Sequence, residues 1–278
     1  MERILVGVDA SANAYAALGW SADLARRARL ELIAARVFDP PQAELPPEQD
    51  RRFRDEQRAE LEDWCESFTA DIPRVQAILL DGDPPDALLD AAASHDADLL
   101  VVGGRGAGGF RHLHLGSVAH HLVHHTTLPL AVVPRSGADS VRHLVVGVDG
   151  SPGSLAAVDL SADLAAALGV ETTVVHAFEP FVEWVPETDP ASWRRRAETE
   201  LGAWATPIAD AGATVELDVD QDIHPVAAIA RALEARAGSI AVVGARGIGG
   251  FTGLRLGRIP IQLVHHTGSA VIVVPTKP

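Results

Sequence analysis

The stretch "ILVGVDASANAYAALGWSADLA" (4–25) joins a strand-length apolar run to an alanine-rich amphipathic segment through a short polar turn. A strand followed closely by a helix is the unit from which parallel sheets are built. The stretch "LVVGVDGSPGSLAAVDLSADLA" (144–165) repeats this pattern 140 positions later. We therefore expect the two halves of the chain to share one fold.

Three further pairs of segments follow the same repeat: "VFDP" (37–40) with "AFEP" (177–180), "VVGGRGAGGF" (101–110) with "VVGARGIGGF" (242–251), and "LVHHTTLPLAVVP" (122–134) with "LVHHTGSAVIVVP" (263–275). A period near 140 residues is too long for a solenoid repeat and fits duplication of a complete domain. We expect one domain at 1–134 and a second at 141–278, joined by the small, polar linker "RSGADS" (135–140).

Strand-like and helix-like segments alternate within the first copy. Strands are expected at 4–8, 30–38, 74–80, 97–103 and 129–133, and helices at 12–28, at 51–69, from about 85 to 94 and from near 117. Apolar strands separated by helices predict a parallel sheet covered on both faces. Each half is thus predicted to be a Rossmann-like, doubly wound α/β domain with a five-stranded parallel sheet. Such sheets bind ligands at the carboxyl ends of their strands, where Asp9 and Gly103 lie.

The composition of the chain excludes several classes of protein. The 278 residues are 47% hydrophobic and 22% charged, which is typical of a globular chain. A formal charge of -15 argues against nucleic acid as a partner, and no apolar run is long enough to cross a membrane. The N-terminus lacks a signal-peptide pattern, and the single Cys65 excludes an internal disulfide. We expect a soluble cytoplasmic protein in which the arginine runs at 25–29 and 193–198 are solvated helix faces.

Glycine is concentrated after the fourth predicted strand, as Gly103-x-x-Gly106, nine residues, then Gly116-Ser117. Glycines at such a place let backbone N–H groups converge on phosphate oxygens. Ser117 begins a helix, and the N-terminus of a helix adds a further anion site. A flexible connection explains a lone glycine loop equally well. The same spacing recurs, however, at Gly244, Gly247 and Gly257.

The pattern G-2x-G-9x-G-[S/T], with "VGVDAS" (6–11) and "LGSVAHHLVHHTTLPLAVVP" (115–134), resembles the universal stress protein family in its tandem two-domain form. The resemblance covers essentially the whole chain. It implies a sheet order of 3-2-1-4-5 and, for the ATP-binding branch of the family, bound ATP with Mg²⁺. It further implies a nucleotide-dependent regulator of the stress response that forms a homodimer.

The resemblance also assigns roles to single residues. Asp9 would lie near the ribose and phosphates, and Val37 would hold adenine through its backbone. The phosphates would be held by Gly103 and Gly106 and, at the helix start, by Gly116, Ser117 and Val118. The matching positions of the second half are Asp149, Ala177, Gly244, Gly247, Gly257 and Arg258.

Arg258 departs from the family pattern, which has Ser or Thr at this position. A guanidinium there either pairs with phosphate or folds into the pocket and blocks it. Pro260 is tolerated only in a first helical turn, which supports a helix start at Gly257-Arg258. We therefore expect the first domain to bind ATP more tightly than the second.

Two other functions remain open. Slow ATP hydrolysis would need a base, a metal and a counter-charge; Asp9 could bind Mg²⁺, and Arg105 and Arg111 lie in the glycine loop, but no catalytic residue stands out. Binding without fast turnover is therefore favoured. In the third reading the chain is a nucleotide-free interaction module. Its two halves would then form a pseudo-twofold pair through the edge strands at 129–133 and 270–274.

Histidines are dense on the helix that follows the glycines. His120 with His124, and His121 with His125, stand four residues apart, which is metal-ligand spacing on a helix face. No Asp, Glu or Cys within the helix completes a site, and the second half keeps only "HH" at 265–266. We interpret them as surface or dimer-edge histidines and predict no metal site.

Overall fold

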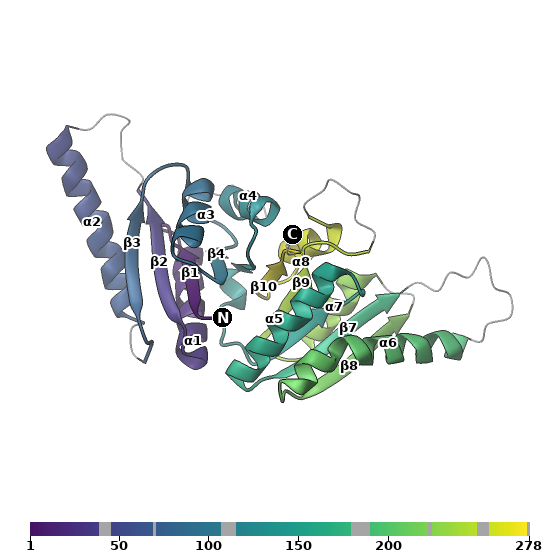
Figure 1. Cartoon of the computed structure of the whole chain (residues 1–278). Coiled ribbons are helices and arrows are strands. Elements are labelled where there is room, and N and C mark those ends of the chain that lie inside the picture. Colours follow the sequence, from purple (N-terminus) through teal and green to yellow (C-terminus); the bar gives the residue numbers. More distant parts are fainter. Residues whose placement is uncertain are drawn as a thin grey trace. The chain divides into compact units, whose positions relative to one another are not determined.

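The computed structural model divides the chain into two compact units, Met1–Ser140 and Val141–Pro278. It describes residues 1–38, 46–68, 71–106, 115–178, 190–221, 224–248 and 256–276. Arg111 lies outside these ranges. Each unit is a sheet with helices on both faces, and strands alternate with helices along the chain (Figure 1).

The first unit contains a parallel sheet in the order β3-β2-β1-β4-β5. Its strands are β1 (Arg3–Gly7), β2 (Glu31–Val37), β3 (Val75–Leu80), β4 (Leu99–Gly103) and β5 (Leu130–Val133). Its helices are α1 (Ala12–Ala28), α2 (Pro47–Glu66), α3 (Pro84–Ser94) and α4 (Ser117–His125), and the 3₁₀ turn η1 (Arg135–Gly137) follows β5. The predicted α/β class and sheet order are confirmed.

The second unit repeats this order as β8-β7-β6-β9-β10, again with parallel strands. Its strands are β6 (His143–Gly147), β7 (Glu171–Phe178), β8 (Val215–Gln221), β9 (Ser239–Gly244) and β10 (Val271–Val274). Its helices are α5 (Pro152–Leu168), α6 (Pro190–Asp210), α7 (Pro225–Glu234) and α8 (Arg258–His266). The helix predicted to start at Gly257-Arg258 has Gly257 as its N-cap residue.

In each sheet the second and third strands lie on one side of the first strand, and the fourth and fifth strands lie on its other side. In the second unit α5 packs against α6, while α7 packs against α8 (Figure 1). Right-handed crossovers explain this arrangement, because connections that run in opposite directions along a sheet lie on opposite faces. This change of side separates the first βα loop from the fourth, and this leaves a crevice at the carboxyl ends of the two central strands.

Apolar side chains of the central strands form the core of each unit. Leu5 and Leu100 in the first unit and Leu144 in the second are fully buried, as is Trp20 on α1. Burying a leucine side chain contributes about 2 kcal/mol relative to exposure. Strands covered on both faces explain why the sequence shows unbroken apolar runs rather than alternation.

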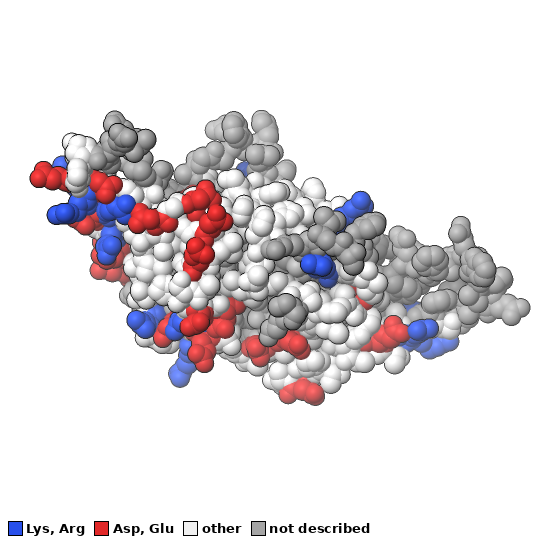
Figure 2. Space-filling model, turned by 45° about the horizontal axis from the view of Figure 1, so that its top comes forward, with Lys and Arg blue, Asp and Glu red and all other residues white. Residues whose placement is uncertain are grey.

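The charged helices carry ion pairs on their solvent faces. On α2, Arg52 pairs with Glu56 and Arg54 with Asp50, both at 2.8 Å. Figure 2 shows acidic and basic side chains side by side over this helix, at the left of the view. The predicted basic runs are paired in the same way, as Arg194 with Glu198 at 3.0 Å illustrates. Across the described part of the chain, no helix is both long and apolar enough to traverse a bilayer.

Candidate functional site

An aspartate follows the first strand of each unit and organises the crevice. The Asp9 Oδ1 atom accepts the Ser11 N–H at 3.0 Å, and the Asp149 Oδ1 atom accepts the Ser151 N–H at the same distance. The Asp149 Oδ2 atom also accepts the N–H of Ile248 at 2.9 Å, in the glycine loop after β9. The carboxylate therefore joins the loop after the first strand to the loop after the fourth.

The pKa of Asp149 is lower than that of an ordinary aspartate. Burial alone would raise it, but hydrogen bonds from Ser151, Ile248 and Ser154 to the carboxylate together outweigh burial. A carboxylate that accepts several backbone N–H groups favours its charged form. Asp149 is therefore ionised at neutral pH and is a weak proton acceptor.

A serine at the start of the first helix makes the second link between the two loops. Ser11 caps α1 by accepting the Ala14 N–H at 3.1 Å, and Ser151 caps α5 by accepting the Ser154 N–H at 3.2 Å. Each serine hydroxyl also donates to a carbonyl oxygen of the glycine loop, that of Arg105 at 3.4 Å or of Arg246 at 3.1 Å. Both units thus fix the path of the glycine loop in the same way.

The first glycine of the pattern packs against backbone. A Cβ on Gly103 would lie 2.9 Å from the carbonyl carbon of Asn13, and one on Gly244 would lie closer still to that of Gly153. These glycines are required because the strand end touches the first turn of the neighbouring helix. The next glycines, Gly106 and Gly247, lie against the carboxylates of Asp9 and Asp149.

The third glycine begins a helix and faces the second. The Gly116 N–H donates to the Gly104 carbonyl at 2.8 Å, and the Gly257 N–H donates to that of Ala245 at 2.7 Å. A Cβ on Gly116 would lie 3.3 Å from the Gly106 backbone nitrogen and would fill the space in front of that N–H group. No side chain of the described residues caps α4 or α8, so the N–H groups of their first turns are available to an anion.

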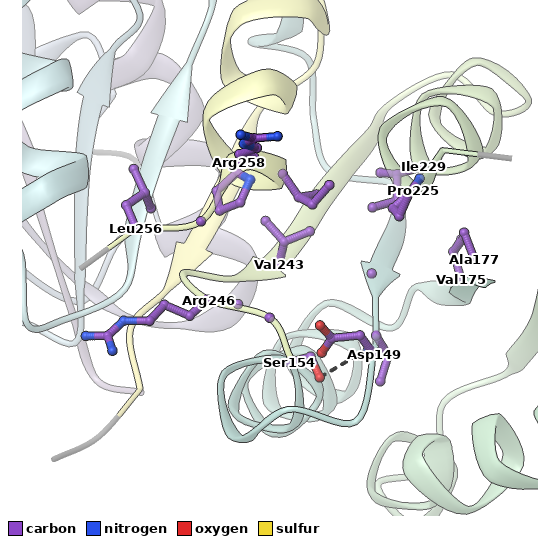
Figure 3. Close-up of a pocket in the computed structure, with 17 residues that line it drawn as sticks. Asp149, Ser154, Val175, Ala177, Pro225, Ile229, Val243, Arg246, Leu256 and Arg258 are labelled. Atoms are coloured by element: carbon purple, nitrogen blue, oxygen red, sulfur yellow. Dashed lines mark hydrogen bonds between the residues drawn. The ribbon is translucent and has the colours of Figure 1, made fainter. Parts of the chain in front are cut away.

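In the second unit these elements surround a cavity of about 640 Å³ (Figure 3). Its wall on one side is apolar, with Val175 and Ala177 at the end of β7 and Ile229 on α7. Asp149 lies at its base, and Arg258 lies on the opposite side. The cavity brings together all the residues predicted for the second half: Asp149, Ala177, Gly244, Gly247, Gly257 and Arg258.

Arg258 does not fill this cavity, because its side chain is exposed at the start of α8. The side chain leaves the cavity open in this structure. Ser117, its counterpart at the start of α4, is exposed in the same way. The two side chains occupy matching positions at the rim of each crevice.

The same contacts bring Asp9, Gly106 and Gly116 together in the first unit. Gly106 lies against Asp9, and Gly116 faces Gly106. Val37 is the last residue of β2, at the carboxyl edge of the sheet, while Ser117 and Val118 open α4.

The helix at about 85 to 94 was predicted, but the part that its counterpart α7 plays in walling the cavity was not. Ile229 contacts Gly147, and Leu88 contacts Gly7 at the matching place in the first unit. The apolar spacing of "PVAAIARALE" (225–234) was the available signal, since it gives this helix one inward face. Ser154 and Arg246 also line the cavity, and neither belongs to the glycine pattern.

The model of the universal stress protein family matches residues 1–134 and again residues 140–275. The chain belongs to the universal stress protein family. The two matches confirm the tandem form that the internal repeat predicted.

Universal stress proteins of two mycobacterial species are similar to this chain over nearly its whole length. A universal stress protein of Mycolicibacterium smegmatis is 28% identical over 292 residues, which cover 98% of this chain and 96% of the relative. One of Mycobacterium tuberculosis is 29% identical over 293 residues, covering 97% and 95%. The crystal structure of a universal stress protein from Archaeoglobus fulgidus, 20% identical, aligns with a TM-score of 0.72 over 99% of this chain and 98% of its own length. This last likeness concerns the fold alone.

Proposed function

We propose that this universal stress protein binds ATP in the crevice of each unit and acts as a nucleotide-dependent regulator without fast turnover. The observation that carries the proposal is the cavity of about 640 Å³ in the second unit, which lies within the size range of ligand pockets. Its apolar side, at Val175, Ala177 and Ile229, suits a purine base. Its other side presents glycine-loop and helix N–H groups, which suit phosphate oxygens.

Binding is favoured over hydrolysis by the state of Asp149. Hydrolysis requires a group that positions or deprotonates the attacking water. Hydrogen bonds from two backbone N–H groups hold the Asp149 carboxylate, and its pKa is lowered. It therefore supports the loops and is a poor general base.

We further propose that the first unit binds ATP more tightly than the second when Mg²⁺ is in excess. The first turn of α4 carries the N–H groups of Ser117, Val118 and Ala119. The corresponding turn of α8 contains Pro260, which has no N–H group, so it offers one donor fewer to a phosphate.

The test compares the variants Gly116→Ala and Gly257→Ala by calorimetric titration with ATP and Mg²⁺. Neither position has a left-handed backbone, and a Cβ on Gly257 would meet its nearest neighbour at 3.4 Å, so both variants should fold. The added methyl group crowds the glycine loop in each unit, 3.3 Å from the Gly106 nitrogen in the first and 3.4 Å from the Ala245 carbonyl oxygen in the second. We expect about a 10-fold loss of affinity at the affected unit. The larger loss of total binding should come from Gly116→Ala. Equal losses would contradict the ranking, and absence of ATP binding by the unaltered protein would contradict the function.

A further inference from the structure

The two crevices differ at the residue that opens the phosphate-facing helix. Ser117 stands at the start of α4 and Arg258 at the start of α8, both exposed at the rim. A serine hydroxyl is an oxygen ligand of the kind that Mg²⁺ prefers. A guanidinium has only donors, so it contacts phosphate directly and repels a cation.

The position of Arg258 is itself unfavourable in the absence of an anion. The N-terminus of a helix carries partial positive charge, and a cation there is destabilising. Among the residues that the structure describes, no carboxylate forms an ion pair with Arg258. Arg246 also lines this cavity, with its guanidinium directed away from Asp149 (Figure 3). A cationic rim of this kind is stabilised when a polyanion binds.

The negative charge of Asp149 does not compensate for the positive charge of Arg258 in binding a metal ion. Both of its oxygens accept backbone N–H groups, from Ser151 at 3.0 Å and from Ile248 at 2.9 Å. At the start of α8 the second unit therefore lacks the hydroxyl that Ser117 supplies at the start of α4, and it holds a guanidinium in its place. The Ser154 hydroxyl also lines this cavity, but it donates to the Ser151 carbonyl oxygen at 3.0 Å. The residues of this crevice do not fit a phosphate-bound Mg²⁺ ion.

We propose that the two units select different charge forms of the same nucleotide. Ser117 adapts the first unit to the magnesium complex of ATP, while Arg258 replaces the metal in the second and adapts that unit to uncomplexed ATP. This inference rests on the proposed function, because it assumes that ATP enters both crevices. The occupancy of the second unit then depends on the ratio of uncomplexed ATP to magnesium-bound ATP.

The test is hydrogen-exchange mass spectrometry during ATP titration, once with EDTA and once with excess MgCl₂. Protection of 117–125 reports the first unit and protection of 258–266 the second. In the unaltered protein, 258–266 should be protected at lower ATP concentration in EDTA than in MgCl₂, and 117–125 should show the reverse. Arg258→Ser should weaken binding of uncomplexed ATP by the second unit about 10- to 100-fold, the effect of one charge-assisted contact.

Two matched variants complete the design. Arg258→Lys keeps a positive charge and should retain most of the binding in EDTA. Ser117→Arg should shift the first unit toward uncomplexed ATP. The inference is overturned if Arg258→Ser leaves binding in EDTA within 2-fold, or if both units prefer the same form of ATP. Failure of ATP to protect either unit in either buffer would instead overturn the proposed function.

Discussion

The two units build the same loop scaffold with different side chains around it. Asp9 and Asp149 accept the same backbone N–H group at the same distance, and the serine caps and the bonds from Gly116 and Gly257 repeat to within 0.3 Å. Matched positions nevertheless hold different residues, among them Asn13 and Gly153, Arg29 and Gly169, Cys65 and Ala205, and Arg3 and His143. Backbone geometry is thus the shared part of the duplicated domain, and side-chain chemistry is where the copies diverge.

The largest loss of stability should come from adding a methyl group where the fourth strand of a unit meets its first helix. On Gly244 the added Cβ would lie closest to Gly153 and also contact Ser154, while on Gly103 it would lie 2.9 Å from Asn13. Each neighbour is backbone and cannot rotate away. We expect Gly244→Ala to lower the free energy of unfolding by about 3 kcal/mol and Gly103→Ala by less.

Urea denaturation of both variants measures this difference. Gly202→Ala is the control, because its Cβ would meet only the end of Leu217, at 3.7 Å. An equal cost at Gly103 and Gly244 would show that the two junctions are equally tight. A negligible cost at both would leave phosphate binding as the main reason for these glycines.

The two units also differ at a buried position that responds to pH. His143 is 3% exposed, and its pKa is lowered first by burial and then by Arg236, against opposing contributions from Glu171 and Glu216. The Nε2 atom of His143 accepts from Arg236 at 2.9 Å, which requires a neutral ring. Arg3 holds this place in the first unit and pairs with Glu31.

The second unit should therefore lose stability in acid. Unfolded His143 gains a proton as the pH falls below about 6.5, whereas the folded ring resists protonation. The contribution of His143 to the free energy of unfolding should be constant above this pH. It should fall as the pH drops through 6.5 toward the pKa of the folded ring. Hydrogen exchange in 143–147 between pH 5 and 8 measures it, and His143→Gln should flatten the profile. A profile that is unchanged in the variant would remove His143 as the cause.

His124 on α4 provides the matched control in the first unit. Its pKa is also lowered, by burial and by the neighbouring His120, His125 and His121. His124→Gln should alter the acid response of 117–125 without altering that of 143–147. If each substitution changed both segments, the two units would not unfold independently.

Sequence alone predicted the features that depend on local pattern. Apolar runs, the internal repeat and the glycine spacing gave the strands, the two domains and the loop positions, because these follow from periodicity and backbone freedom. The close approach of Gly244 to Gly153, the two-loop role of Asp149 and the wall formed by Ile229 depend on contacts between segments distant in the chain. No local pattern encodes such contacts. The exposure of Arg258 likewise does not follow from its chemistry, which leaves two alternatives open.

A smaller effect is expected where α1 ends. Arg29 has φ 56° and is left-handed, while Gly169 ends α5 with φ 64°. The conformation is costly for arginine and almost free for glycine. Arg29→Gly should therefore raise the stability of the first unit by up to about 1 kcal/mol, and Gly169→Arg should lower that of the second by a similar amount. Thermal unfolding of both variants measures these changes, and the two substitutions should change stability in opposite directions.

The smallest effect should be Cys65→Ala, which gives α2 the residue found at the matching position of α6. Cys65 is 5% exposed and Ala205 is 3% exposed, so both face the core. Loss of the sulfur leaves a small cavity and should cost about 1 kcal/mol or less. Burial, followed by Glu62, raises the pKa of the Cys65 thiol to about 11, so the folded protein should react with an aromatic disulfide reagent at pH 8 only as fast as it opens. Reaction at the rate of a free thiol would show that α2 is less closely packed in the first unit than α6 is in the second. Looser packing of this kind is the only difference between the two units that this position can reveal.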